Sequence, residues 1–177
     1  MSSDRNLRYA EAIVTLARGE DALDVVEDEL LAVARAVDGN EELRQRLTDI
    51  HLPVARRLGF VESEAMAAAH PATRTALATI IAAERAGDLA VIAQEVARRA
   101  AAARDEELAE AYVAVPLDDA RRAALKDALE RATGRKLDLK VIVDPSVVGG
   151  VRARIGDTVI DGSLLRRLTD LRTRVGG

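Results

Sequence analysis

Length, composition and charge exclude several classes of protein. The chain has 177 residues, of which 49% are hydrophobic and 32% charged, with a net charge of −4 and a pI near 5.3, so it can bury a core and does not resemble a disordered or membrane-spanning chain. It contains no cysteine, no tryptophan and only two tyrosines and one phenylalanine, which excludes disulfides and thiolate chemistry and disfavours nucleic-acid binding through basic fields or base stacking. The first residues lack the pattern of a signal peptide, so we expect a cytoplasmic protein.

Alanine divides the chain into two parts. Of its 34 alanines, 33 lie at or before Ala132. Alanine is the strongest helix former, whereas the valines, isoleucines and glycines after Leu137 favour strands and turns. We therefore predict a helical domain over residues 1–106 and a small α/β domain over residues 107–177. Large apolar residues are missing between Val96 and Leu108, so we interpret this stretch as a helical rod that leaves the bundle and buries little.

Capping residues and prolines divide the first part into successive helices. In chain order, we expect these helices over about 4–18 and 20–38, from Asn40, from Pro53, over 61–69, from Pro71 and from Asp88. Gly19 and Gly39 follow the first two of them, and glycine is the common residue at the end of a helix.

The second part alternates between strands and helices in the order β-α-β-β-α. We expect strands over 111–115, 137–143 and 151–155, and helices that begin at Asp118 or Asp119 and at Ser163. Gly156 and Asp157 suit a two-residue hairpin loop, because glycine comes first. Leu164, Leu168 and Leu171 share one face of the last helix, and Arg166 and Arg167 lie beside them.

A search for catalytic chemistry finds no active site. His51 and His70 lie far apart in sequence and have no cysteine to join them in a metal site. Ser163 is explained as a helix cap. Gly149 and Gly150 are not followed by the Gly-Lys-Ser or Gly-Lys-Thr of a phosphate loop. We predict no catalytic residue, no metal site and no cofactor.

The first helix carries more apolar surface than a single core contact requires. Leu7, Ala10, Val14 and Ala17 form one stripe, and Tyr9, Ala12, Ile13 and Leu16 form a second stripe beside it. Together they cover roughly 220°, against the ~100° of an ordinary surface helix. Two interpretations stay open: the helix is central in its own bundle, or the second stripe receives a partner helix and the apolar helix over 75–83 forms the other wall.

Three segments of the chain resemble one known family. The run from Asp144 to Val151, the run from Ile155 to Ser163 and the leucines at 168 and 171 are similar to the C-terminal signature of the F-type ATP synthase delta subunit, whose mitochondrial relative is the oligomycin-sensitivity-conferring protein. Tyr9-Ala10-Glu11-Ala12 resembles the start of that family, and the segment from Glu84 to Leu89 lies where the family has a helix-turn-helix joint.

The resemblance implies a mainly α fold, with an N-terminal six-helix bundle and a small C-terminal α/β region. It also implies a non-catalytic stator subunit at the cytoplasmic face of the cell membrane, peripheral and without membrane insertion, which ties the catalytic head to the stalk. The expected contacts with the N-terminal helix of the alpha subunit are Tyr9, Ile13, Val14, Leu16, Leu77, Ile80 and Ile81. The expected contacts with the b subunits are Leu164, Arg166, Arg167, Leu168 and Leu171.

A second function remains open from the residues alone. A free-standing helical adaptor that binds an amphipathic partner helix would show the same bundle and the same apolar groove. An enzyme ranks third, because no acid, base and nucleophile cluster in the sequence.

Overall fold

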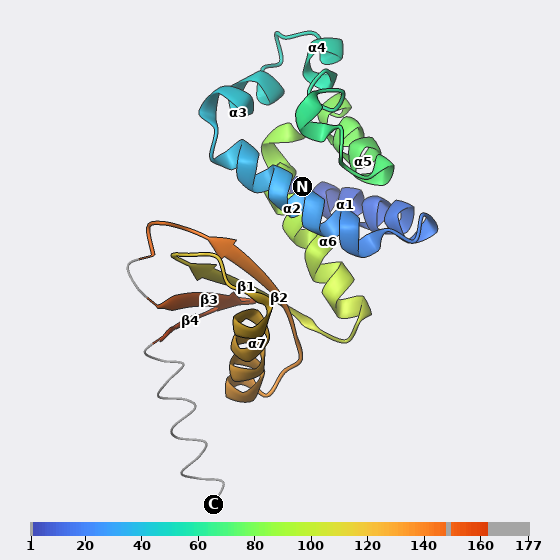
Figure 1. Cartoon of the computed structure of the whole chain (residues 1–177). Helices are drawn as coiled ribbons and strands as arrows, with labels where there is room; N and C mark the ends of the chain where they lie inside the picture. The colour runs from blue at the N-terminus through green and yellow to red at the C-terminus, as the bar shows by residue number, and fades with distance from the viewer. Residues whose placement is uncertain (1, 148–149, 163–177) are drawn as a thin grey trace, which may run out of the picture. The chain divides into compact units, whose positions relative to one another are not determined.

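The computed structural model describes residues 2–147 and 150–162 (Figure 1). The described residues are mainly helical, with a small mixed sheet toward the C-terminus. The chain divides into two compact units, Met1–Ala100 and Ala101–Gly177. The division lies within a helix, whereas the sequence suggested a boundary after residue 106.

Helices build the first unit. Its α-helices are α1 (Ser2–Gly19), α2 (Leu23–Asp38), α3 (Glu41–Thr48), α4 (Val54–Leu58), α5 (Pro71–Ala82) and α6 (Leu89–Ala103), the last of which continues into the second unit. Two 3₁₀ turns, η1 (Glu64–Met66) and η2 (Ala86–Asp88), lie between them.

Several helix starts follow the expected capping chemistry. The Asn40 side chain accepts a hydrogen bond from the Leu43 amide (3.0 Å) and so caps α3. Pro71 occupies the first turn of α5, where its missing N–H costs no hydrogen bond. The Asn40 cap is a local feature, because Asn40 lies three residues from the amide that it satisfies.

Three helix ends share a feature that the sequence did not predict. Asp21, Glu84 and Asp105 take φ values of 51°, 59° and 58°, a left-handed conformation more usual for glycine. After α1, the Ala22 amide donates to the Ala17 carbonyl (2.8 Å), which is the long hydrogen bond of a Schellman motif. Equivalent bonds end α5 and α6, so acidic residues close all three helices.

One helix prediction in the first unit is refined and another is corrected. Gly19 is the last residue of α1, as expected, but the left-handed residue that closes the helix is Asp21. Residues 61–69 contain only the short η1 and turns. The hydrogen bonds of that segment span three residues, as in the Met66 amide to the Ser63 carbonyl (2.9 Å), so an α-helix does not form there.

The core of the first unit lies where its helices meet. Helix α1 packs on α2 and α5, α2 also packs on α3 and α5, and α4 packs on α5. Its largest fully buried apolar side chains are Val26, Leu30, Leu77, Ile80, Ile81, Ile92 and Val96. These residues follow helical spacing within α2, α5 and α6, so each of these three helices turns one apolar face inward.

Helix α6 is buried further along than the sequence suggested. Ala97, Ala100 and Ala101 have no exposed surface, so the interpretation of this stretch as a rod that buries little is wrong. The alanines continue the face of Ala93 and Val96 at helical spacing. When a neighbouring element packs close to a helix, even an alanine side chain is fully covered. The absence of large apolar residues therefore does not show that a helix face is exposed.

The second unit is a sheet with one helix across it. The strands are β1 (Glu107–Val113), β2 (Leu137–Val143), β3 (Val151–Ile155) and β4 (Thr158–Asp161), and α7 (Asp119–Thr133) connects β1 to β2. The strand order is β2-β1-β3-β4. The β1–β2 pair is parallel, whereas β1–β3 and β3–β4 are antiparallel, so the sheet combines one βαβ unit with a hairpin.

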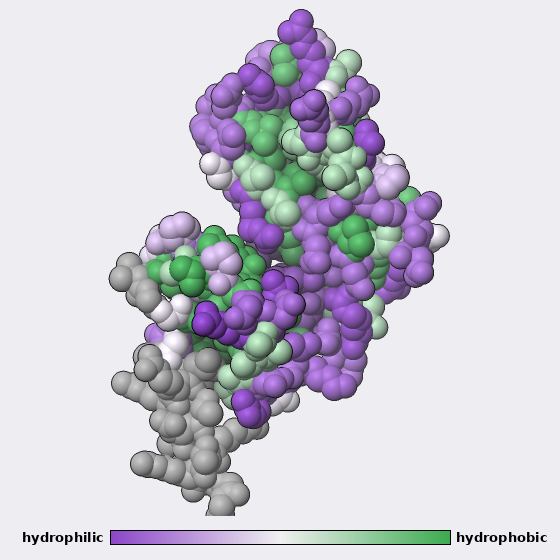
Figure 2. All heavy atoms as spheres, in the orientation of Figure 1, coloured by the Kyte–Doolittle hydropathy of each residue, from purple (hydrophilic) through white to green (hydrophobic). Residues whose placement is uncertain are grey.

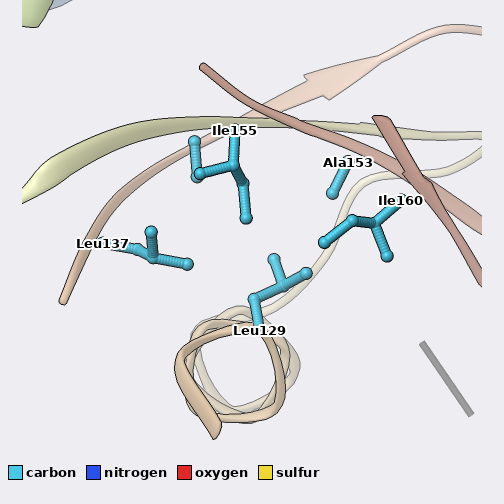
Figure 3. Packing of buried hydrophobic residues seen from close by; sticks show 6 residues of the cluster. Leu129, Leu137, Ala153, Ile155 and Ile160 are labelled. Atoms are coloured by element: carbon cyan, nitrogen blue, oxygen red, sulfur yellow. The ribbon is translucent and has the colours of Figure 1, made fainter. Parts of the chain in front are cut away.

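Helix α7 covers one face of this sheet. Its Leu129 points toward Leu137, Ala153, Ile155 and Ile160 (Figure 3). All of these side chains are nearly or fully buried. Their spacing of two residues within a strand places them on the same face, and that face carries the core of the unit.

The strand pattern differs from the predicted β-α-β-β-α order. Strand β1 begins four residues before the predicted start at residue 111, and the predicted order contains no strand where β4 lies. A two-residue loop requires a returning strand: Ile155 pairs with Thr158 across the loop, and Gly156 has φ 55°. The predicted last helix, from Ser163, lies outside the described residues.

Candidate partner-binding surface

The predicted alpha-subunit contacts on α1 and α5 come together but are mostly buried. Helices α1 and α5 pack against each other. Ile13 and Val14 are 4% and 7% exposed. The predicted α5 residues are covered even more completely: Leu77, Ile80 and Ile81. These five side chains therefore belong to the buried core of the first unit rather than to its surface.

Only two predicted residues of this site reach the surface. Tyr9 and Leu16 are partly exposed, and Ala12 between them is exposed. These three positions lie on adjoining parts of one helix face. Within the second stripe of α1, Tyr9, Ala12 and Leu16 are therefore accessible at the surface. Ile13 belongs to the core.

The exposed side of α5 was not singled out from the sequence. Thr75, Thr79 and Ala82 are exposed, and Ala78 is partly exposed. The Thr75 and Thr79 hydroxyls donate to the carbonyls of Pro71 (3.0 Å) and Thr75 (2.8 Å), so their protons are used within the helix. A helical wheel centred on the large residues Leu77, Ile80 and Ile81 would have found this opposite side.

A shallow cleft of about 370 Å³ lies on the α4 side of α5. Its lining combines apolar side chains with one acid and one base: Leu58, Val61, Glu62, Pro71, Arg74, Thr75 and Ala78. Arg74 Nε donates to the Val61 carbonyl (3.2 Å), which fixes the loop before η1 to α5. This hydrogen bond therefore ties one wall of the cleft to α5.

Larger exposed hydrophobic residues are scattered rather than gathered. Among the described residues they are Leu7, Val25, Ile50, Val54, Val91, Val115, Val143 and Val159. Figure 2 shows hydrophobic areas separated by hydrophilic surface on the visible face. Isolated apolar residues of this kind are normal on a folded protein.

In the second unit, the sheet face opposite α7 carries a charged pair. Arg154 of β3 lies opposite Glu110 of β1 in the antiparallel register, and its Nε donates to the Glu110 carboxylate at 3.0 Å. This hydrogen bond raises the pKa of the Arg154 guanidinium. Glu110 is buried, so the pair compensates an acid that would be costly alone.

The predicted b-subunit contacts cannot be placed in this surface. Leu164, Arg166, Arg167, Leu168 and Leu171 lie outside the described residues, as does Gly149. Within the described ranges, no three His, Asp or Glu side chains are grouped to hold a metal ion. No described helix has the length and apolarity needed to cross a membrane.

One family of known proteins matches most of the chain. The model of the family described as "ATP synthase delta (OSCP) subunit" matches residues 6–175. The ATP synthase subunit delta of Parafrankia sp. (strain EAN1pec) is 38% identical over 177 residues, covering 97% of this chain and 63% of that protein. The corresponding subunit of Frankia alni is 39% identical over 163 residues, covering 92% of this chain and 58% of that protein.

Two further matches are a relative of which this chain covers a smaller share and a solved structure of lower sequence identity. The ATP synthase subunit b-delta of Mycobacterium sp. (strain KMS) is 33% identical over 174 residues, which cover 97% of this chain and 39% of that protein. A chain of the Toxoplasma gondii mitochondrial ATP synthase hexamer superposes with a TM-score of 0.57 at 18% identity, with 97% of both chains covered, and so shares the fold. The chain thus spans about three fifths of the curated delta subunits that it matches.

Proposed function

Because the chain belongs to the ATP synthase delta (OSCP) subunit family, we propose that it is a non-catalytic stator subunit of the F-type ATP synthase. In this role it links the catalytic head to the b subunits of the peripheral stalk, so that proton flow is coupled to ATP synthesis. The observation that carries the proposal is the family match over residues 6–175. We place the subunit at the cytoplasmic face of the cell membrane, bound to the complex.

For the first unit, we propose the N-terminal helix of the alpha subunit as the partner. The packing of α1 on α5 supports this site. Tyr9 and Leu16 are partly exposed on α1, the helix that lies next to α5. The other residues of the predicted set are buried in the core of α1 and α5: Ile13, Val14, Leu77, Ile80 and Ile81. Ile13→Asp would bury a charge in this core and disturb the fold, so this substitution is a poor test of binding.

Exposed positions give a cleaner test of this contact. We expect Thr79→Arg to weaken binding of an alpha-subunit N-terminal peptide at least tenfold, because a long charged side chain would have to be displaced or desolvated. Ala36→Arg, at an exposed position of α2, is the matched control and should bind like the wild type. Equal affinities of the two variants in calorimetry would remove this side of α5 from the interface.

For the second unit, we propose the b subunits as the partner. The name of the Mycobacterium relative joins b and delta in one protein, which supports a close relation between these two parts. The arginines at 166 and 167 beside Leu164, Leu168 and Leu171 suit an acidic helical stalk end. Electrostatic steering of this kind is strongest at low salt.

Reconstitution tests the function as a whole. Inverted membrane vesicles whose ATP synthase lacks its delta subunit should pump protons poorly on ATP, because head and stalk are not joined. Adding the purified chain should restore pumping and should bring the alpha and b subunits down together in a pull-down. If the chain binds neither subunit and pumping stays low, the stator assignment is wrong, and a free-standing adaptor becomes the better description.

A further inference from the structure

The N-terminus of α5 is held by an acid from another helix. The Glu29 carboxylate of α2 accepts hydrogen bonds from the His70 amide (3.0 Å to one oxygen and 3.2 Å to the other) and from the Thr73 hydroxyl (2.5 Å). Thr73 has no exposed surface. The two donors lie 41 and 44 residues from Glu29 in sequence, so the contact is tertiary.

This arrangement resembles a capping box whose acid comes from outside the helix. In a capping box, the third residue of a helix returns its own carboxylate to the amide of the capping residue. In α5 the third residue is Thr73, which has no carboxylate and instead donates its hydroxyl to Glu29. Glu29 accepts from the amide of the capping residue His70. A carboxylate at this end also interacts favourably with the helix dipole.

The C-terminal end of α5 is held by two other helices. Arg57 of α4, which is 3% exposed, pairs with Glu84 at 3.3 Å. Arg85 Nη2 donates to the buried Asn6 side chain of α1 (2.6 Å). Both ends of α5 are therefore anchored by polar contacts, to α2 at its start and to α4 and α1 just beyond its end.

We propose that Glu29 is a positioning residue, which holds the first turn of α5 in the geometry that the partner helix requires. The proposal rests on the proposed function, in which α5 forms one wall of the alpha-subunit site. Glu29 itself need not touch the partner. Without its carboxylate, the first turn of α5 opens more often, and the partner must then bear the free energy of ordering it.

Removal of the hydroxyl tests this role with little change of shape. Thr73→Val keeps the size of the side chain but cannot donate to Glu29, whereas Thr73→Ser keeps the donor. We expect Thr73→Val to raise amide hydrogen exchange in the first turn of α5 about tenfold, consistent with loss of a hydrogen bond to a charged group. Its affinity for an alpha-subunit N-terminal peptide should also fall about tenfold, and Thr73→Ser should lie close to the wild type in both measurements.

Glu29→Gln removes the charge itself and should change both readouts in the same direction. Asn40→Ala is the matched control, because it removes the cap of α3 rather than that of α5; it should leave α5 exchange and peptide affinity within about twofold of the wild type.

The outcomes separate this proposal from the proposed function. If Thr73→Val and Glu29→Gln leave α5 exchange unchanged, or if they speed exchange without weakening the peptide, the positioning role is overturned. If wild-type protein does not bind the peptide, the alpha-subunit site is wrong, and faster α5 exchange in the two variants would then limit Glu29 to holding the helix.

Discussion

At the scale of single residues, the acidic residues that close three helices adopt a left-handed conformation that lowers the free energy of unfolding. An L-residue in the left-handed region crowds its Cβ against the backbone, whereas glycine has no Cβ. Asp21 is exposed and has φ 51° after α1. The sequence favours Gly19 as the left-handed residue, because glycine usually takes this conformation. In the structure Asp21 takes it, and the Schellman hydrogen bonds run from the amides of Asp21 and Ala22.

We expect Asp21→Gly to stabilise the protein by about 0.5–1 kcal/mol, with part of the relief offset by the extra freedom of glycine in the unfolded chain. Asp21→Ala should be no more stable than the wild type, because it keeps the Cβ and alanine tolerates the left-handed region less well than aspartate. Urea unfolding midpoints of the three proteins measure the order. A glycine variant less stable than the alanine variant would contradict this account.

A second residue-scale prediction concerns pH. Hydrogen bonds from the side chain and the backbone amide of Ser146 lower the pKa of the Asp144 carboxyl, and the charge of Arg152 acts in the same direction. A lowered folded-state pKa adds stability above the usual value of ~4, and this stability is lost as the pH falls through the folded value. Asp144→Asn has no such titration, so the stability gap between wild type and variant should shrink between pH 6 and pH 3 in urea unfolding. A gap that is constant over this range would contradict the role of the charge.

At the scale of elements, α6 shows how small side chains make a contact. Ala97 and Ala100 are fully buried on the face that also carries Ala93 and Val96. A helix rich in alanine and arginine forms readily whether or not it is covered. Its propensity therefore indicates that a helix forms, and only the surrounding structure decides which alanines are covered.

Ala97→Leu should lower the free energy of unfolding by about 1–3 kcal/mol, because its three added carbon atoms have no space in a buried face of α6. Ala32→Leu, at an exposed position of α2, is the control and should change stability by no more than about 0.5 kcal/mol. Urea unfolding of both variants decides whether α6 is covered at this position. Equal stability of the two variants would restore the interpretation of a rod that buries little.

At the scale of the whole molecule, the two compact units each have their own core. Leu129 is fully buried between α7 and the sheet of the second unit, with Leu137 and Ile155 as neighbours (Figure 3). The core of the first unit is built from other residues, among them Leu30 and Ile80. Cooperative units of this kind can open separately.

Leu129→Ala should destabilise the second unit by about 2–5 kcal/mol, the usual range for a truncated core leucine. Hydrogen exchange should show lost protection in β1 and β2 and unchanged protection in α2 and α5. Leu125→Ala, at a partly buried position of the same helix, should have a smaller effect. An equal loss of protection in α2 would mean that the two units unfold together.

The sequence by itself determined the features that depend on near neighbours. Asn40 caps α3 because the amide that it satisfies is three residues away, and Gly156 allows the hairpin because its own φ is positive. The change from alanine to β-branched residues separates the helical part from the sheet-containing part, since these residues differ in backbone preference. The family resemblance also lay in contiguous runs, and the comparison over residues 6–175 confirms it.

Only the tertiary structure decided which apolar and polar groups are covered. Ala12 and Ile13 belong to the same apolar stripe of α1 on a helical wheel, yet Ile13 is buried and Ala12 is exposed. Glu29 reads as one acid in an acidic run, but it meets His70 and Thr73, more than 40 residues away. Burial and polar partners depend on which helices pack together, and contacts between distant segments leave no fixed spacing in the sequence.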